Sequence, residues 1–493
     1  MMWRVRVIPN RYADSVRLMV VAREVRDMPG VRGCEVAMGT AANLEALAVR
    51  GVEAPAAGPG DVVVAVSAPD GAGEDALRVA ERHLSAPVIV DGSLASRAEQ
   101  PPRSVPAAAV RLADANLALV SVPGEYAALV AHQALTRRLH VFLFSDHVTV
   151  EQEVELKRRA VRLGLLVMGP GCGTAMLGGI GLGFANVVRP GPVGIVAAAG
   201  TGAQEVACLV DAAGAGVSQI VGVGGRDLSA EVGGTMFRAG MRMLAGDDET
   251  ETLVLVSKSP APEVVRCLAA EVPAGKRVVA AFVGGAGAGA PFELHDTLEA
   301  AALAAAQAPL PVCAELERAV DARRARSAGR RLLGLFSGGS LAHEAVTILE
   351  AELGPVAGNV GHGDAVADGT GGHTVLDLGE EEYTRGRPHP MVDLDLRIAM
   401  LEHAAAGDDV GCVLLDVVLG HAAHPDPARE LAPAVARIAD GGATVLVRVC
   451  GTRADPQDAD RQARTLREAG ALVVPSNAAA ARLAVRAVAE AAA

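Results

Sequence analysis

The sequence predicts an α/β protein of three domains, each with a parallel sheet and flanking helices. Short apolar runs alternate with amphipathic helical patterns along nearly the whole chain, and this alternation is typical of parallel sheets. Of the 493 residues, 51% are hydrophobic but only 2% are aromatic, and 56 are glycine. A core of Ala, Val and Leu with many tight turns suits layered α/β domains. At about 150 residues per domain, the length favours three domains.

Charge and cysteine content exclude several classes of protein. The formal net charge is −13 and no basic block interrupts it, which argues against nucleic acid because phosphate contacts need clustered Lys and Arg. The seven cysteines have no CxxC spacing, so we expect reduced thiols in a cytoplasmic protein. We expect neither a signal peptide nor membrane contact, because no charged start precedes an apolar run and no apolar run reaches roughly 18 residues.

The first domain is expected over residues 1–190, and its pattern is clearest from residue 115 onward. Strands are expected at 115–121, 141–145 and 165–168, with helices at 124–139 and 150–163. Ligands of parallel sheets bind beyond the carboxyl ends of the strands. The loops at these ends contain Pro123, Gly124 and Cys172, which are therefore candidate ligand contacts. Residues 94–106 show no periodicity and are expected to form a flexible loop.

The second domain is expected over residues 191–310 and opens with the stretch that organises the chain. An apolar strand at 193–198 leads into Gly200-Thr201-Gly202 and a helix from about residue 203. Such a loop leaves backbone N–H groups free at a helix N-terminus, where the helix dipole favours an anion. The sequence therefore predicts a phosphate-binding loop here; the alternative is a simple tight turn.

The third domain, expected over residues 331–493, repeats this arrangement. A strand at 332–336 is followed by the turn Gly338-Gly339-Ser340 and a helix at 341–353, and a charged helical segment at 315–330 links the two domains. Two such helix starts facing each other would hold one phosphate from both sides.

Seven stretches of the chain together carry a family resemblance: 113–128, 167–176, 183–188, 194–205, 222–234, 257–265 and 372–393. With the order of the pieces described above, they resemble the succinyl-CoA synthetase superfamily, most strongly its FdrA branch, over essentially the whole chain. In that superfamily an α-type chain carries a Rossmann-like CoA-binding domain and a ligase domain, and the β-type chain ends in a flavodoxin-like ligase domain. The resemblance implies that this chain fuses both, with its two phosphate-facing helices beginning at the two glycine turns.

One departure from the family concerns the phosphoryl carrier. The family's synthetases carry a phosphohistidine in the loop that follows the strand expected at 277–283, and this loop here reads GGAGAGAPFELHD. His295 is interpreted as a helix-start residue. Glu205, which matches the glutamate that supports the phosphohistidine, is present. The nucleotide-binding ATP-grasp domain is missing.

These differences favour direct transfer of a group to or from phosphate over ligation driven by ATP. The FdrA branch is associated with a multisubunit oxamate carbamoyltransferase of allantoin breakdown, in which oxalurate and phosphate give oxamate and carbamoyl phosphate. The resemblance therefore implies phosphate as a co-substrate, no required cofactor, a small anionic substrate and other subunits as partners. CoA remains possible, although no clean G-x-G-x-x-G follows the first strand.

Several residues have two open readings. Arg226 and Lys258 are predicted to hold the organic anion as catalytic residues together with Glu205; for Arg226 and Asp227 the alternative is an internal ion pair. Cys172 is either a nucleophile or, more simply, a buried structural thiol. Arg385, Arg387 and His389 would suit an anionic substrate or a partner subunit, or else a solvated loop. No metal site is predicted, because the glycine-rich loop around His362, Asp364 and His373 fixes no geometry.

Two rival functions also remain open. The first is an acyl-CoA synthetase that uses CoA together with a separate nucleotide-binding chain. The second is a non-catalytic subunit that binds CoA or a metabolite and supports catalytic partners.

Overall fold

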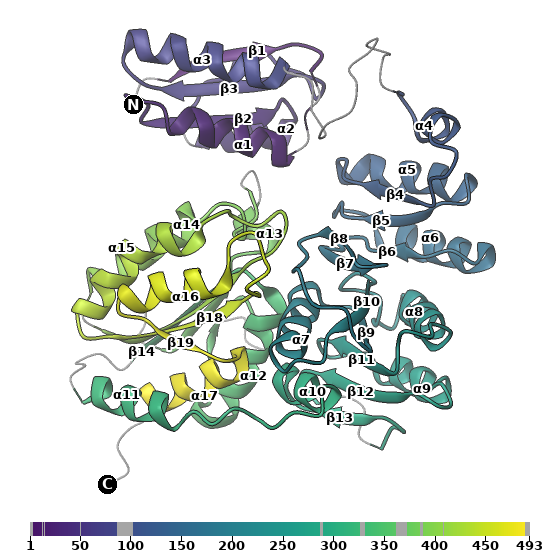
Figure 1. Cartoon of the computed structure of the whole chain (residues 1–493). Coiled ribbons are helices and arrows are strands. Elements are labelled where there is room, and N and C mark those ends of the chain that lie inside the picture. Colours follow the sequence, from purple (N-terminus) through teal and green to yellow (C-terminus); the bar gives the residue numbers. More distant parts are fainter. Residues whose placement is uncertain are drawn as a thin grey trace. The chain divides into compact units, whose positions relative to one another are not determined.

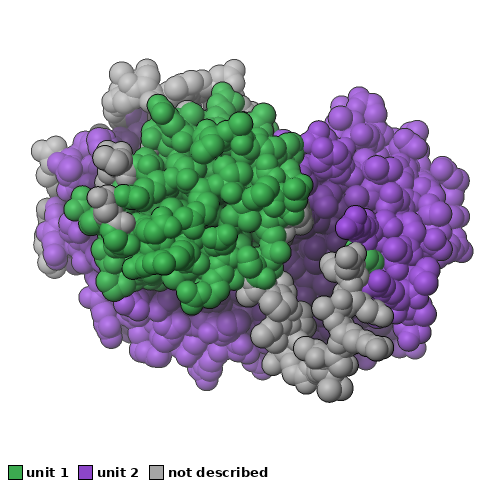
Figure 2. Space-filling view, turned by 90° about the horizontal axis from the view of Figure 1, so that it is seen from above, with its two compact units in different colours: residues 1–102, 380–389 green, residues 103–379, 390–493 purple. Residues whose placement is uncertain are grey.

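The structure is a computed structural model that divides into two compact units, coloured separately in Figure 2. Unit 1 comprises Met1–Pro102 and Glu380–His389, and unit 2 comprises Arg103–Gly379 and Pro390–Ala493. The predicted α/β class with parallel sheets is confirmed in unit 2. No helix in the described part of the chain is both long and apolar enough to cross a membrane. The described residues are 3–11, 13, 15–49, 51–85, 102–285, 289–325, 331–360, 372–384, 388–407 and 409–488.

Unit 1 is built on an antiparallel sheet. The central strand, β3, pairs antiparallel with both β1 and β2 in the order β1-β3-β2. Helices α1 and α3 cover one face with their own core, and α2 lies against the other. The expected first domain, 1–190, is thus divided near residue 102, since its N-terminal part has a separate core and the strands described there pair only antiparallel. The elements are β1 (Arg4–Ile8), α1 (Ser15–Arg26), β2 (Gly33–Met38), α2 (Ala41–Val49), β3 (Val62–Ser67), α3 (Asp70–Ser85) and α13 (Glu381–Thr384).

Unit 2 begins with a small parallel sheet in the order β4-β5-β6. Its strands and its two longer helices lie where the sequence predicts them. Helix α6 starts with a capping box, in which Thr149 and Gln152 satisfy each other's backbone N–H groups. The elements are α4 (Val105–Arg111), β4 (Leu117–Val120), α5 (Gly124–Thr136), β5 (His140–Leu143), α6 (Val150–Leu163) and β6 (Val167–Met168).

The next sheet has seven strands in the order β13-β12-β11-β9-β10-β7-β8. A hairpin, β7–β8, pairs antiparallel with β10, so this second domain begins before residue 191. Figure 1 shows α7 and α10 on one face of the sheet and α8 and α9 on the other. The elements are β7 (Thr174–Leu177), β8 (Ile180–Gly183), β9 (Val193–Ala197), α7 (Gly200–Ala212), β10 (Val217–Gly222), α8 (Thr235–Ala245), β11 (Thr252–Ser257), α9 (Pro262–Ala270), β12 (Arg277–Phe282), β13 (Glu293–His295) and α10 (Leu298–Ala305).

The third domain has a parallel sheet in the order β15-β16-β14-β17-β18-β19. Helix α11 (Ala314–Arg324) precedes it. The elements are β14 (Arg331–Phe336), α12 (Gly339–Leu353), β15 (Ala357–Gly358), β16 (Thr374–Asp377), α14 (Asp395–Ala405), β17 (Val410–Val418), α15 (Pro427–Asp440), β18 (Thr444–Cys450), α16 (Ala459–Glu468), β19 (Leu472–Val474) and α17 (Asn477–Val488).

The second and third domains share one topology and one hydrophobic core. In the second domain β9 lies between β10 and β11, and in the third β14 lies between β16 and β17, so the strand order reverses beside β9 and beside β14. The β7–β8 hairpin and the short edge strand β15 are additions to this shared order. Ligands of such sheets bind at this switch point. Side chains from α7, α10, α12 and α17 form a single core between the two sheets. The helices that begin at the two switch points are therefore held by common packing.

Candidate functional site

The helices α7 and α12 begin directly at the two glycine turns. Helix α7 starts at Gly200 and α12 at Gly339, with Ala199 and Gly338 as their N-caps. Both starts lie a few residues earlier than the sequence pattern indicates, which places the glycines in the first helical turns. Neither N-cap has a side chain that accepts a hydrogen bond, and neither first turn contains an acidic residue. The N-cap residue of each helix thus offers no side-chain partner to the free N–H groups of the first turn.

The structure brings the two glycine turns into contact. The backbone N–H of Ser340 donates to Thr201 Oγ1 at 3.3 Å. A Cβ atom added at Gly338 would lie 2.9 Å from Thr201 Cβ, and one added at Gly202 would lie 3.4 Å from Ser340 Cβ. Any larger side chain at Gly338 would collide with Thr201, so the close approach requires glycine there.

A buried ion pair that sequence reasoning missed fixes the turn before α12. Asp416 at β17 accepts hydrogen bonds from the backbone N–H groups of Ser337 and Gly338, both at 2.8 Å. Arg397 of α14 donates to the same carboxylate at 2.8 Å, and neither charged side chain is more than 1% exposed. Asp416 interrupts the apolar run of β17, but the sequence does not show which basic side chain it meets.

Lys258 lies beside the start of α12. Its Nζ atom is 3.3 Å from the position of a Cβ atom added at Gly339, and Asp377 Oδ2 is 2.4 Å from the same position. The Lys258 side chain is exposed, and the described part of the chain offers its ammonium group no ion pair within 4.0 Å. His343 of α12 reaches the end of β12, with Nε2 3.7 Å from the Cβ position of Gly284. Lys258, which the sequence predicts as an anion contact, therefore lies beside one of the two glycine turns.

Glu205 is fully buried and connects the two domains. Its carboxylate accepts from Arg448 Nε at 2.9 Å and from the backbone N–H of Asn477 at 2.9 Å. Arg448 belongs to β18 and Asn477 starts α17, so Glu205 holds α7 to the third domain. A direct contact between Glu205 and a substrate would have to displace these bonds.

The stretch 183–188, which carries part of the family resemblance, also joins the two domains. Asn186 donates to Leu419 O at 3.0 Å and to Asp455 Oδ2 at 2.9 Å. Gln204 of α7 donates to Asn186 Oδ1 at 3.0 Å. Burial raises the pKa of Asp455, although hydrogen bonds from Thr452, Val187 and Asn186 oppose this shift. These contacts attach the stretch 183–188 to the loops that follow β17 and β18 in the third domain.

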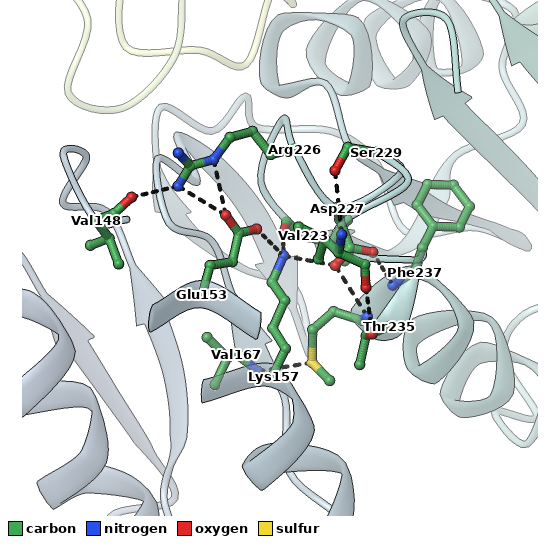
Figure 3. Close-up of polar contacts among 12 residues, drawn as sticks. Val148, Glu153, Lys157, Val167, Val223, Arg226, Asp227, Ser229, Thr235 and Phe237 are labelled. Carbon is green, nitrogen blue, oxygen red and sulfur yellow. Dashed lines mark hydrogen bonds and ion pairs between the residues drawn. The ribbon is translucent and has the colours of Figure 1, made fainter. Parts of the chain in front are cut away.

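Arg226 and Asp227 do not pair with each other, but both join a buried charge cluster (Figure 3). The Arg226 guanidinium bonds Glu153 at 2.9 Å and Val148 O at 2.7 Å, and the side chain is 46% exposed. Asp227 is fully buried, where it accepts from Lys157 at 2.7 Å and from the start of α8. Lys157 also donates to Glu153 at 2.7 Å and to Val223 O at 2.9 Å. The cluster ties α6 to the second domain.

The three candidates in the first domain have structural explanations. A Cβ atom at Gly124 would lie 2.4 Å from Asp146 O, so this position packs against the neighbouring loop. Pro123 is the N-cap of α5, whose first turn contains Glu125. Cys172 donates to Thr174 O at 3.4 Å, and burial raises the pKa of its thiol to about 12. An unreactive, buried thiol is the reading that this geometry favours.

The predicted loop contacts at Arg385 and Arg387 fall outside the described residues, as do His362 and Asp364. His389 belongs to unit 1. His373 accepts the backbone N–H of Leu332 through Nδ1 at 3.1 Å. Within the described ranges, no group of three or more His, Cys, Asp or Glu side chains is placed to hold a metal ion.

Comparison with known protein families finds two matches. Residues 335–487 match a family described as CoA-ligase, and residues 1–100 match one described as the AllF heavy metal-associated domain. Cys34 is the only cysteine among those first 100 residues. It lies in the core, where burial raises the pKa of its thiol to about 12. A buried single thiol does not fit a soft-metal site, which needs accessible thiolates.

Comparison with individual proteins gives a relative along nearly the full chain. The chain is 34% identical to YahF of Escherichia coli K12 over 500 residues, which cover 95% of each protein. It is 31% identical over 154 residues to a succinate–CoA ligase α subunit of Archaeoglobus fulgidus, covering 30% of this chain and 52% of that one. For the Methanothermobacter thermautotrophicus α subunit the identity is 25% over 226 residues, covering 43% and 77%. With its CoA-ligase domain and its paired glycine-turn helices, the chain belongs to the FdrA family of the succinyl-CoA synthetase superfamily, as an α-type chain fused to a β-type ligase domain.

Proposed function

We propose that the paired glycine turns bind a phosphate-type anion and that the protein is a subunit of an enzyme that transfers an acyl or carbamoyl group to or from phosphate. The observation that carries this proposal is the contact between two helix starts whose N-cap residues provide no side-chain cap and whose first turns contain no acidic residue. Free N–H groups and the positive ends of two helix dipoles together favour an anion. The proposed phosphate contacts are Gly200, Thr201, Gly202, Gly338, Gly339 and Ser340.

In this proposal, the ammonium group of Lys258 supplies the positive charge that balances the nearby carboxylate of Asp377. Asp377 places a carboxylate oxygen close to Gly339, and this negative charge opposes an anion at the start of α12. An ammonium group beside the same glycine offsets the repulsion. Lys258 is accordingly the side chain that we expect to contact phosphate or the organic anion.

Carbamoyl transfer between oxalurate and phosphate is the proposed reaction, and this finer assignment rests on the FdrA resemblance. A phosphate oxygen attacks the carbamoyl carbon, the bond from that carbon to the amide nitrogen of oxamate breaks, and the nitrogen takes a proton. Holding phosphate in line with the carbonyl supplies proximity, and backbone donors stabilise the developing oxyanion. Such a reaction requires neither a nucleotide nor a covalent phosphoryl carrier.

An acyl-CoA synthetase is the second candidate, favoured by the CoA-ligase family match over residues 335–487. In that case CoA would supply the thiol that accepts the acyl group, and another chain would bind the nucleotide. His343 lies on α12, the helix that begins at Gly339, and its Nε2 atom is close to Gly284, which follows β12. If a phosphoryl carrier is needed, His343 is the first side chain to test.

An assay of the complex purified with its neighbouring gene products tests the proposal. We expect carbamoyl phosphate to form from oxalurate and phosphate, and Gly202→Glu to abolish this activity by filling the space against Ser340. Gly246→Glu is the matched control, because Gly246 has ordinary space for a Cβ atom at the end of α8. Formation of a CoA ester with release of ADP, and no carbamoyl phosphate, would overturn the proposal in favour of the synthetase.

A further inference from the structure

Three glutamates, Glu205, Glu299 and Glu344, are buried where α10 and α17 begin, and each is at most 1% exposed. Two of them have guanidinium partners. Glu205 pairs with Arg448 at 2.9 Å, and Glu299 pairs with Arg482 at 2.5 Å. Within the described residues, no cation lies within 4.0 Å of Glu344. A buried carboxylate without a counter-ion is costly when it is ionised.

Glu344 instead meets two neutral donors. Its Oε1 accepts from the backbone N–H of Leu298 at 2.6 Å, and its Oε2 accepts from Asn477 Nδ2 at 2.7 Å. Burial, with a smaller contribution from the carboxylates of Glu205 and Glu299, raises the pKa of Glu344 to about 7, although these two hydrogen bonds oppose the shift. Both protonation states of Glu344 are therefore populated near neutral pH.

Asn477 joins the two helices that start at the glycine turns. Its backbone N–H donates to Glu205 of α7 at 2.9 Å. Its side-chain Nδ2 donates to Glu344 of α12 and also to Leu341 O of α12 at 2.9 Å. One residue, itself 1% exposed, thus ties both helices to the start of α17.

The amide of Asn477 can serve either state of Glu344. Its Oδ1 atom is buried, and the described part of the chain gives that atom no hydrogen-bond partner. An ionised Glu344 accepts from Nδ2, whereas a protonated Glu344 must donate its proton to an acceptor. A rotation of the amide by about 180° exchanges Oδ1 and Nδ2 and provides that acceptor, at the cost of the hydrogen bond from Nδ2 to Leu341 O.

We propose that the Glu205–Asn477–Glu344 bridge positions the two glycine turns, and that it holds them more tightly when Glu344 carries its proton. The neutral form makes the bridge without a buried, uncompensated charge. The ionised form places a third carboxylate beside Glu205 and Glu299 with no cation of its own, which weakens the bridge. This inference rests on the proposed function only for its consequence, a change of anion affinity with pH.

Hydrogen exchange of the full-length protein, followed by mass spectrometry without any anion, tests the inference. Peptides that contain the starts of α7 and α12 are compared at about pH 6 and about pH 8.5, after correction for intrinsic exchange rates. In the wild type we expect protection to fall on the order of tenfold at the higher pH, since one proton changes the opening equilibrium up to tenfold per pH unit. Glu344→Gln, which mimics the neutral form, should keep its protection at both values.

Glu352→Gln is the matched control, because Glu352 is an exposed glutamate on the same helix; it should behave as the wild type. Should Glu344→Gln not fold, Asn477→Ala serves as the second variant, with protection at the α12 start already low at about pH 6. Equal protection at both pH values in the wild type, or a persistent fall in Glu344→Gln, would overturn the proposal. Because no anion is present, a failure of the glycine turns to bind phosphate would not alter these results.

Discussion

Glu205 and Glu344 occupy equivalent positions on two equivalent helices, and each caps a helix of the other domain. Glu205 is the sixth residue of α7 and Glu344 is the sixth residue of α12. Glu205 accepts the N–H of Asn477, which starts α17, and Glu344 accepts the N–H of Leu298, which starts α10. Of the two, only Glu205 has a cation within 4.0 Å among the residues that the structure describes, namely Arg448. The junction between the domains is therefore symmetric in its hydrogen bonds but not in its charges.

This asymmetry predicts that Glu344 makes stability depend on pH. Its pKa of about 7 in the folded protein lies above the ordinary value of 4.5. Its contribution is therefore fully present below about pH 4.5 and is lost as the pH rises through about 7. The free energy of unfolding of Glu344→Gln, taken relative to that of the wild type, should therefore rise by up to about 3 kcal/mol when the pH is raised from about 5 to 8.5. Urea unfolding at both pH values measures this gain, and parallel curves for the two proteins would contradict it.

Thr201 should stabilise the contact between the glycine turns. Its hydroxyl accepts the backbone N–H of Ser340, a donor at the start of α12. Thr201→Val keeps the shape of the side chain but removes the hydrogen-bond acceptor, so we expect the free energy of unfolding to fall by about 1–2 kcal/mol. Thr201→Ser retains the hydroxyl and should lose much less. Thermal unfolding of both variants distinguishes lost hydrogen bonding from lost packing; equal losses would count against the hydrogen bond.

Lys258 should contribute to anion affinity without contributing to stability. The side chain is exposed and lies beside Gly339. We expect Lys258→Gln to weaken phosphate or sulfate binding about tenfold, which corresponds to about 1.4 kcal/mol. Lys258→Arg should retain most of the affinity. Calorimetric titration at fixed ionic strength measures the effect, with Arg266→Gln, an exposed cation of α9, as the control. Unchanged affinity in Lys258→Gln would place the anion elsewhere.

Lys157 should be essential for the attachment of α6 to the second domain. It is fully buried between Glu153 and Asp227. Lys157→Met leaves two buried carboxylates with less positive charge beside them. We therefore expect the free energy of unfolding to fall by roughly 3–5 kcal/mol. Adding Asp227→Asn should recover part of this loss, because one of the uncompensated charges is removed.

The midpoint of urea unfolding measures these losses. Arg158→Met provides the control, since Arg158 is the exposed neighbour of Lys157. No recovery in the double variant would show that the ion pair with Asp227 is not the reason for the loss.

The sequence pattern predicts both glycine turns, the strand before each of them and the helix after each of them, because these follow from local periodicity. Local periodicity does not distinguish parallel from antiparallel pairing. The strand 62–67 is buried on both faces, as parallel strands are, but its partners run antiparallel. For the same reason the hairpin at 174–183, which extends the second sheet, lies on the wrong side of the expected boundary at residue 190.

The candidate site is predictable only in part. The glycine turns are visible in the sequence, and so is Lys258 after a buried strand. The pairing of Arg397 with Asp416 is not visible, because a helix and a strand of the third domain bring the two together only in the folded sheet. The pairing of Arg448 with Glu205 is not visible either, because these partners meet only when two domains pack together. Arg226 illustrates the converse: its position after a strand and a glycine turn suggests ligand binding, but the fold directs its guanidinium to Glu153.

The single core shared by α7, α10, α12 and α17 has a consequence for assembly. If the same two domains were separate polypeptides, each would expose this apolar surface and their union would depend on protein concentration. The chain between Ala305 and Arg331, including α11, makes their association intramolecular and raises the effective concentration of each domain near the other. Equal amounts of the two halves are thereby guaranteed by translation itself, and dilution cannot separate the two glycine turns.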